Sequence, residues 1–350
     1  MVVASLLGLV VAASGRSTPA PSRSAPPAGS PASGPSPGSP AAGPPAGPAP
    51  PFRWSDPTLT TPIPADAVLS SRSAGWARQL ATGPALDIYE YGTGIYRADS
   101  STPTQRVRMT QERSRGPTAL SGRTVSMPTG QALLDLIPSG TDGSFVVMQP
   151  DGRHEVDIWQ PVVSGSGASA HLVSASYGDY YASGNAWHDA TGAIGQGTGS
   201  GKAMGAGAIT DSELRAALAS VGQPGGGVIP HALNFSSSMS SSDYVAPAGR
   251  SDGDSGGGIP EGQRIRLDPT IDLAAISGIT PLELVIGRTL QTYGAYVTDS
   301  GGASMAFGVQ LPSSVPGGSW LAQHHVPDYY NMPHLPWASG LQVLKSWDGS

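Results

Sequence analysis

Two sets of residues between positions 229 and 302 have the types needed for chemistry on a polysaccharide. The first set comprises His231, at the start of an apolar strand, Tyr293, near the end of a helix, and Arg264 and Arg266 between them. In β-elimination from a uronic acid, arginine neutralises the carboxylate, His or Tyr removes the α-proton, and Tyr protonates the leaving oxygen. These residue types therefore predict a polysaccharide lyase, with Tyr296 as a further substrate contact.

The second set is a pair of carboxyl groups, Asp268 and Asp299. Two carboxyls that flank a glycosidic bond can hydrolyse it, one as proton donor and the other as base or nucleophile. A structural explanation competes with both sets. Asp268 precedes a proline and would start a turn, Tyr293 falls on the apolar face of its helix, and the two arginines would form a solvated strand face. The sequence leaves catalysis and structure open as alternatives.

A strand segment upstream offers a sugar-binding surface. Asp157 and Trp159 lie two residues apart, so they share one face of a strand, and Gln160 follows directly. A tryptophan ring beside a carboxylate suits a sugar, because the ring stacks on it while the polar partner accepts a hydrogen bond. A tryptophan at this position is equally typical of a buried core. We expect these three residues to contact the substrate if the site binds a glycan.

The run Gly253-Asp254-Ser255-Gly256-Gly257 resembles the nucleophile loop of chymotrypsin-like serine proteases. In that family the loop forms an oxyanion hole beside the serine, and the resemblance implies His171 as the base and Asp211 as its orienting carboxylate. However, the run lies in a segment of mostly Gly, Ser and Asp, and Gly258 replaces the family's proline. The chain also has no cysteine for the family's disulfides. A serine protease is therefore a remote alternative.

Neither a cofactor nor a metal is expected. The glycine-rich segment 195–203 resembles a phosphate-binding loop, but its glycine spacing is wrong and Ala203 replaces the Ser or Thr that binds magnesium. His324, His325 and His334 are spaced somewhat like zinc ligands, but they have no cysteine partner. We expect these histidines to be solvated.

The elements that must position the candidate residues are mostly strands. From Ser144 to Tyr177, apolar runs alternate with turns such as Pro150-Asp-Gly, which predicts an antiparallel meander. Two capping boxes, Thr210-x-x-Glu213 and Thr280-Pro-x-Glu283, each predict the start of a helix. A short strand is expected from Met305 to Val309. The pattern favours a mainly β fold, a jelly-roll-like antiparallel sandwich with two or three short helices, and an α+β fold is the alternative.

The chain divides into three segments by composition. Residues 2–13 form an apolar run with the length of a signal-peptide core, so we expect a signal peptide at residues 1–15 and a secreted, extracellular protein. Residues 16–51 are rich in Pro, Ala, Gly and Ser and are expected to be a disordered linker. Residues 52–350 are expected to form one globular domain with an irregular, aromatic C-terminal tail. The absence of cysteine excludes disulfides and a lipoprotein anchor.

Charge and hydropathy exclude some partners. The formal net charge is -6 and the pI is about 5.6, whereas nucleic-acid binding selects for basic surfaces. The apolar run near the start is shorter than the ~20 residues that span a bilayer, so no membrane span is expected. An extracellular polysaccharide or cell-wall glycan is the expected partner.

Several motifs together resemble a family of secreted actinobacterial proteins. They are His231-Ala-Leu, Ile259-Pro-Glu-Gly-x-Arg-x-Arg-Leu-Asp-Pro269, Gln291-x-Tyr-Gly-x-Tyr-x-x-Asp-x-Gly-Gly302 and, upstream, Pro150-Asp-Gly-Arg-x-x-x-Asp-Ile-Trp-Gln160. The resemblance covers most of residues 85–310. It implies secretion and an actinobacterial source, and it treats residues 251–258 as a variable insertion. It carries over no catalytic residue.

These observations predict a secreted carbohydrate-active protein, either a polysaccharide lyase or a glycoside hydrolase. The alternative from a different class is a noncatalytic glycan- or cell-wall-binding module that uses Trp159 and neighbouring aromatic residues. An enzyme requires that polar residues at strand ends converge in one cleft. A binding module requires a flat aromatic platform without coupled titratable groups.

Overall fold

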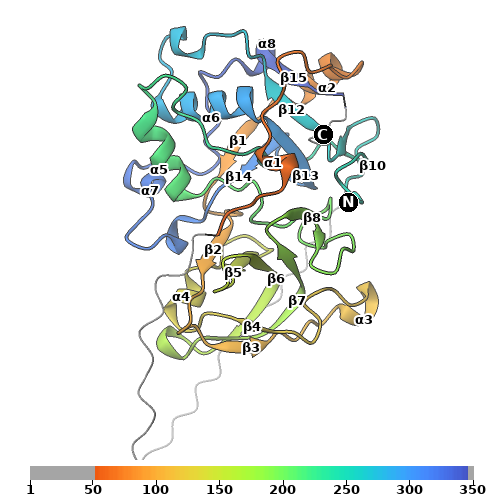
Figure 1. The fold of residues 1–350 in the computed structure, drawn as a ribbon, viewed down its shortest axis with the longest axis vertical. Helices are drawn as coiled ribbons and strands as arrows, with labels where there is room; N and C mark the ends of the chain where they lie inside the picture. Colours follow the sequence, from red (N-terminus) through yellow and green to blue (C-terminus); the bar gives the residue numbers. More distant parts are fainter. Residues whose placement is uncertain (1–51, 346–350) are drawn as a thin grey trace, which may run out of the picture. The chain divides into compact units, whose positions relative to one another are not determined.

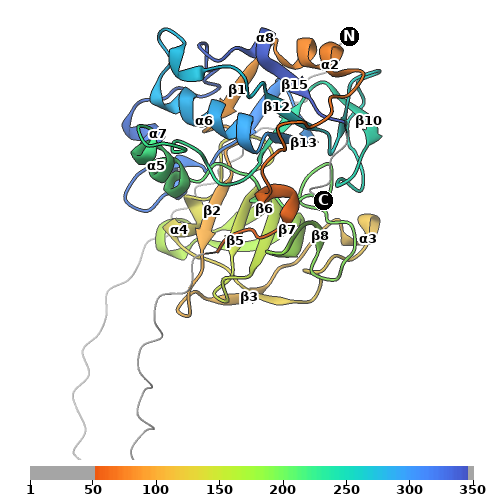
Figure 2. The ribbon, with the colours of Figure 1, turned by 45° about the horizontal axis from the view of Figure 1, so that its top comes forward.

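Two β-sheets organise residues 52–345, the part of the chain that the computed structural model describes (Figure 1). The signal peptide predicted at residues 1–15 and the linker predicted at 16–51 lie outside the described residues, as do residues 346–350. In Figures 1 and 2, a six-stranded sheet with its helices forms the upper part of the described chain, and a five-stranded sheet forms the lower part.

The six-stranded sheet combines segments from the beginning, middle and end of the described chain. In spatial order its strands are β1 (Pro84–Asp87), β14 (Met305–Gly308), β9 (Leu233–Ser237), β13 (Ala295–Ser300), β12 (Arg264–Leu267) and β15 (Leu341–Val343). The pairs β1–β14 and β13–β9 are parallel, and the other pairs are antiparallel. The two parallel pairs join segments that are far apart in the sequence, because parallel neighbours need a crossover connection.

Helices cover this sheet and close the larger hydrophobic core. They are α2 (Ser73–Leu80), α5 (Asp211–Ser220), α6 (Pro281–Thr292), α7 (Trp320–Gln323) and α8 (Trp337–Gly340). The capping box predicted for α6 is confirmed: Thr280 Oγ1 accepts from the Glu283 N–H at 3.2 Å, and the Glu283 carboxylate accepts from the Thr280 N–H at 2.9 Å. Leu282, Val285, Ile286 and Leu290 then pack into the core, as their three- and four-residue spacing predicts.

The five-stranded sheet has a second core. Its strands, in spatial order, are β2 (Gly94–Arg97), β5 (Phe145–Met148), β6 (His154–Ser164), β7 (His171–Ala182) and β8 (Asn185–Asp189). The antiparallel meander predicted from Ser144 is confirmed as β5–β6–β7, with Asp157 opposite Asp179. The apolar side chains of Phe145, Val156 and Ile158 are fully buried on one face.

The remaining elements are short. They are α1 (Pro57–Thr60), α3 (Glu112–Arg115), α4 (Gln131–Leu134), the pair β3 (Thr104–Arg106) and β4 (Thr124–Ser126), the pair β10 (Ser240–Tyr244) and β11 (Ile259–Glu261), and 3₁₀ turns at Gly167–Ser169, Leu273–Ala275 and Pro312–Ser314. Within residues 52–345, no helix is both long and apolar enough to cross a membrane.

The predicted mainly β class is confirmed, whereas the jelly-roll sandwich is not. A jelly roll is built from antiparallel strands, but β1–β14, β13–β9, β2–β5 and β10–β11 are parallel pairs. The predicted strand from Met305 is present as β14. The helix predicted at Thr210 is present as α5, with the Thr210 side chain accepting from the Glu213 N–H at 3.3 Å.

Candidate active site

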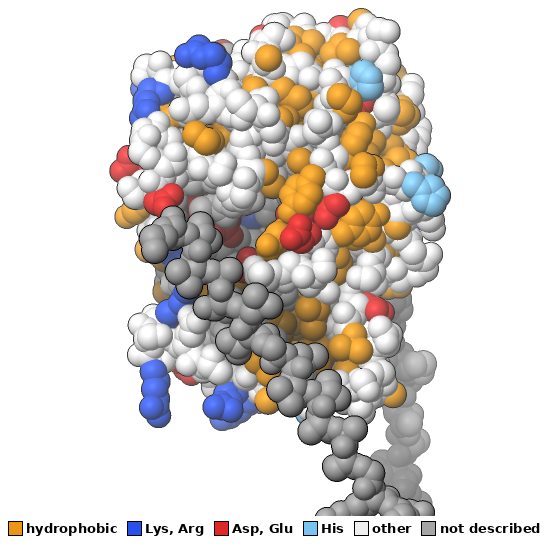
Figure 3. Space-filling view, turned by 180° about the vertical axis from the view of Figure 1, so that it is seen from behind, with side chains coloured by type: hydrophobic (Ala, Val, Ile, Leu, Met, Phe, Trp, Pro, Cys, Tyr) orange, Lys and Arg blue, Asp and Glu red, His pale blue; other side chains and the backbone are white. Residues whose placement is uncertain are grey.

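Both sheets contribute to a cavity of about 1220 Å³. From the five-stranded sheet come Trp159 on β6 and Tyr177 on β7, and from the six-stranded sheet come residues of β9, β13 and β14. The glycine-rich loop 196–199, Arg250 and Asp252 also line the cavity. In Figure 3 one face of the molecule is hollowed at mid-height, with acidic side chains at the edge of the hollow.

The loop 195–201 is rich in glycine because carboxyl groups approach its backbone closely. A Cβ added at Gly197 would lie 2.3 Å from an Asp157 carboxyl oxygen, and one added at Gly199 would lie 2.2 Å from Asp252 Oδ1. Real Cβ atoms do not tolerate such distances, so a larger residue would displace these carboxyls. The segment that resembles a phosphate-binding loop is thus a scaffold for two carboxyl groups.

An irregularity in β13 aims Asp299 at the cavity. Val297 pairs with Phe235 and Asp299 pairs with the next residue, Ser236, so Thr298 is an extra residue in the ladder. With regular pairing, Asp299 would share the face of Val297 and point into the core, because strand side chains alternate. The extra residue instead sends Asp299 to the cavity side, where Ser236 also lies.

Half-buried Asp299 and exposed Asp252 line the cavity, and Glu261, which is 0% exposed and does not line it, contacts Asp252. Burial, and then the charge of Asp252, raises the pKa of Asp299 well above its ordinary value. Burial and a hydrogen bond to Asp252 raise the pKa of Glu261 to about 9.

Asp252 is the ionised member of this group. Burial alone would raise the pKa of Asp252, but hydrogen bonds from Glu261, Asp299 and Ser300 outweigh burial and hold that pKa below its ordinary value. The Ser300 N–H donates to Asp252 Oδ1 at 3.0 Å. The cluster therefore combines Asp252, whose pKa is lowered, with Asp299 and Glu261, whose pKa values are raised, and such a contrast suits a proton donor beside a carboxylate.

An aromatic and cationic wall faces the same cavity. The guanidinium of Arg115 lies 5.1 Å from the ring centroid of Trp159 and 5.5 Å from that of Tyr177. Arg250 donates from Nη1 to Gln196 Oε1 at 2.7 Å and from Nη2 to the Thr198 carbonyl. Aromatic rings and hydrogen-bonding cations together suit a polar ring-shaped ligand.

A second acidic group lies beneath the loop. Glu155 and Asp157 are 0% exposed; Glu155 Oε1 accepts from the Gly205 N–H at 2.9 Å, and Asp157 Oδ2 accepts from the Met204 N–H at 2.8 Å. Burial raises both carboxyl pKa values, and it lowers the pKa of buried Lys202 to about 7. Asp157, predicted to bind substrate, thus anchors the backbone that carries the loop.

The residues proposed for β-elimination do not line this cavity. His231 lines a pocket of about 180 Å³ and lies 3.4 Å from Glu213 Oε2. Tyr293 ends α6, where its carbonyl accepts from Arg264 Nε at 2.8 Å. Asp268, the partner proposed for Asp299 in hydrolysis, is half-buried in a turn and accepts from the Thr270 N–H at 2.9 Å.

The other predicted contacts occupy separate positions. Arg266 donates to Gln342 and to the Pro64 carbonyl, and the Tyr296 hydroxyl donates to the Thr58 carbonyl at 3.1 Å. Gln160 accepts from the Ser176 hydroxyl at 2.9 Å. Arg264 is fully buried. Of the ten residues predicted for the site, Asp299 and Trp159 line the large cavity.

Sequence reasoning missed five residues of this site: Asp252, Glu261, Arg250, Arg115 and Tyr177. Glu261 stands in the quoted run Ile259-Pro-Glu-Gly, and Asp252 directly precedes the protease-like run. Acidic residues within otherwise apolar or glycine-rich runs are the available signal. Nothing local in the sequence associates either residue with Asp299.

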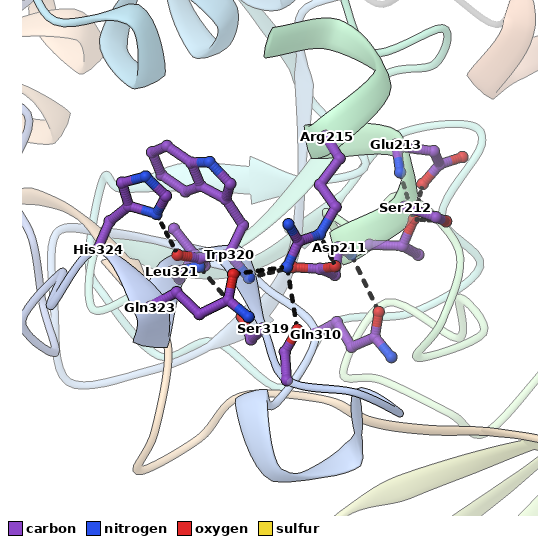
Figure 4. A network of polar contacts seen from close by, with 12 residues as sticks. Asp211, Ser212, Glu213, Arg215, Gln310, Ser319, Trp320, Leu321, Gln323 and His324 are labelled. Carbon is purple, nitrogen blue, oxygen red and sulfur yellow. Dashed lines mark hydrogen bonds and ion pairs between the residues drawn. The ribbon is translucent and has the colours of Figure 1, made fainter. Parts of the chain in front are cut away.

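The three residues of the protease comparison have other partners. Figure 4 shows Asp211 among the contacts between α5 and α7: its carboxylate binds Arg215 Nε at 2.6 Å and accepts from the Trp320 N–H at 2.6 Å. The His171 ring lies 3.1 Å from the Ser169 carbonyl. Among the side-chain hydrogen bonds of residues 52–345, none joins Ser255 to a histidine.

Within the described residues, no group of three or more His, Cys, Asp or Glu has the arrangement of a metal site. Comparison of the chain with protein-family models, with curated proteins and with solved structures gives no match. The cavity and its residues therefore carry the functional argument alone.

Proposed function

We propose that this protein is a secreted glycoside hydrolase that binds a polysaccharide in the large cavity and cleaves it with Asp299 and Asp252. The observation that carries the proposal is a pair of adjacent carboxyls lining one cavity, whose surroundings shift their pKa values in opposite directions. Burial raises the pKa of Asp299 well above its ordinary value, while hydrogen bonds lower the pKa of Asp252. Two carboxyls whose environments push their pKa values apart are the usual basis of acid and base roles in hydrolases.

The proposed reaction uses both protonation states. Asp299 donates its proton to the glycosidic oxygen as the bond from this oxygen to the anomeric carbon breaks. Because Asp299 and Asp252 are hydrogen-bonded to each other, the sugar must enter between them, and the Asp252 carboxylate then stabilises the positive charge that develops at that carbon. Water then adds to the carbon and returns a proton to Asp299, so that both carboxyls regain their starting states.

The arrangement favours this proposal over the two alternatives. A lyase built on His231 and Tyr293 would need those side chains in the cavity, and neither lines it. A noncatalytic module would present aromatic rings on a flat surface without coupled carboxyls. Here Trp159 and Tyr177 share a concave cavity with Asp252 and Asp299.

The test is to incubate the full chain with a panel of plant and bacterial polysaccharides. New reducing ends and the ultraviolet absorbance of unsaturated uronates are followed together. Hydrolysis produces reducing ends without absorbance, and we expect that result for at least one polysaccharide. Asp299→Asn should abolish it, whereas Asp243→Asn, which removes an exposed carboxylate outside the cavity, should not.

Two outcomes would overturn the proposal. Absorbance rising together with reducing ends would identify a lyase. Binding of a polysaccharide without any cleavage would identify a noncatalytic module.

A further inference from the structure

We infer that the cavity selects an anionic polysaccharide and that Arg250, assisted by Arg115, binds a sugar carboxylate next to the reacting carboxyls. The inference rests on the proposed function and adds the substrate class. It is carried by two cavity-lining arginines that have no anionic partner in the described part of the chain.

Arg250 is held in position by neutral groups only. Its two Nη atoms donate to the Gln196 side-chain oxygen and to the Thr198 carbonyl, while its Nε is buried and has no hydrogen-bond partner. None of the ion pairs within residues 52–345 includes it. Partial burial of a guanidinium without an anion costs desolvation free energy. The charge-assisted hydrogen bonds that form when a carboxylate binds it offset that cost.

Arg115 adds a second positive charge on the same side of the cavity. Its guanidinium lies over Trp159 and Tyr177, the two rings expected to contact a sugar. These contacts orient the cation without neutralising it, because aromatic rings carry no net charge. Planar guanidinium groups match a carboxylate better than a lysine ammonium does, since they offer paired donors.

The loop 196–199 places the cationic subsite beside the reacting carboxyls. Gln196 and Thr198 contact Arg250, and Gly199, the next residue, lies against Asp252. A carboxylate-bearing sugar held by Arg250 would therefore lie next to the sugar whose bond is cleaved. The same charge offsets the repulsion that ionised Asp252 would exert on an anionic chain.

The experiment measures binding rather than cleavage, using the full-length Asp299→Asn protein so that no probe is consumed. The probes are polygalacturonate, alginate and hyaluronan, each compared with its carboxyl-reduced, neutral form. At least one acidic polymer should bind about tenfold or more tightly than its reduced form. Arg250→Gln should remove that preference, Arg250→Lys should retain part of it, and Arg115→Gln should weaken it.

Arg78→Gln is the matched control, because Arg78 is exposed on α2 and does not line the cavity. If Arg250 only supported the loop, Arg250→Gln would weaken the binding of acidic and reduced polymers equally, which would overturn the inference. Preferential binding of the reduced polymers would also overturn it and would leave the proposed hydrolase intact. If neither form of any polymer bound and the wild-type protein cleaved no polysaccharide, the proposed function itself would fail.

Discussion

Asp252 and Asp299 show how two identical side chains acquire different chemistry from their surroundings. Asp252 is exposed to the cavity and accepts from the Ser300 N–H, whereas Asp299 is largely withdrawn from water beside it. A backbone donor stabilises a carboxylate, and removal from water destabilises one. This contrast is the basis for proposing Asp299 as the proton donor and Asp252 as the carboxylate that stabilises positive charge.

We expect Asp299→Asn and Asp252→Asn each to reduce hydrolysis at least about a hundredfold, the usual contribution of general acid–base catalysis. The wild-type rate should fall in acid, because Asp252 becomes protonated there, at a pH below the ordinary pKa of an aspartate. The rate should also fall at higher pH, because Asp299 loses its proton at its raised pKa. The measurement is the pH dependence of kcat/KM. A rate that rises steadily through neutral and alkaline pH would exclude Asp299 as the acid.

At the level of single residues, the sequence predicts part of this site. Two of the residues named from the sequence, Asp299 and Trp159, line the large cavity, and their roles there stay predictions. The sequence does not predict Asp252 as a site residue. Its carboxylate accepts from the N–H of Ser300, which lies 48 residues away, and no local pattern indicates that contact. His231 is predicted from its residue type and its position at the start of an apolar strand, and neither shows that its ring lies 3.4 Å from Glu213 Oε2.

Among the elements, the loop 195–201 lies closely against Asp252, one of the two carboxyls proposed to act on the substrate. We expect Gly199→Ala to lower activity on the order of a hundredfold, since a displacement of about 1 Å is enough for such a loss. The reason is the 2.2 Å approach of the new Cβ to Asp252 Oδ1. The measurement is kcat/KM together with a denaturation curve.

The control is Gly256→Ala, a glycine substitution in a different loop, the segment 251–258. A Cβ at Gly256 meets nothing within 4 Å, so this variant should keep both activity and stability. Equal losses in the two variants would show that general loop flexibility matters, and not the contact with Asp252.

Helix α6 offers a prediction about stability. Thr280→Ala removes the side chain that accepts from the Glu283 N–H, and we expect the free energy of unfolding to fall by about 1 kcal/mol. Thr292→Ala in the same helix is the control: the Thr292 hydroxyl only donates to the Arg288 carbonyl, which the helix already pairs. Urea denaturation measures both variants, and an equal cost would contradict a capping role for Thr280.

Elements were predicted better than their arrangement. Capping boxes and the Pro-Asp-Gly turn are local signals, so α6 and the β5–β6–β7 meander followed from the sequence. The parallel pairing of β9 with β13 and the extra residue at Thr298 depend on contacts between distant segments. Regular alternation would have directed Asp299 into the core, so period counting alone cannot find the site.

For the whole molecule, buried acids dominate the pH dependence of stability. Burial raises the pKa of Asp179 to about 7, that of Glu261 to about 9 and that of Asp87 to about 6. Above its unfolded-state pKa, each such group binds more protons in the folded protein than in the unfolded chain. Its contribution to stability is therefore lost as the pH rises towards the folded-state pKa and beyond it. Lys202 has the opposite effect, but only above about pH 7.

We expect the free energy of unfolding to fall between pH 5 and pH 7, by about 1.4 kcal/mol per pH unit for each excess proton. Urea denaturation at several pH values measures this slope. Glu261→Gln imitates the protonated carboxyl, so the slope of this variant should be smaller by about one proton. Stability that is constant or rises over this range would contradict the assignment of neutral buried acids.

The C-terminal segment completes the rim of the cavity. The Asp328 carboxylate accepts from the N–H groups of Ile88, Tyr89 and Glu90 at 2.8, 3.1 and 3.0 Å, and the Tyr329 hydroxyl donates to Glu90 at 3.1 Å. This fixes the segment that carries Tyr91, which lines the cavity together with Tyr329. The partner of the rim segment near residue 90 is Asp328, which is synthesised 240 residues after Ile88. This contact can form only after residue 328 has been made, and a chain that ended before Asp328 would lack the carboxylate that holds the backbone of residues 88–90.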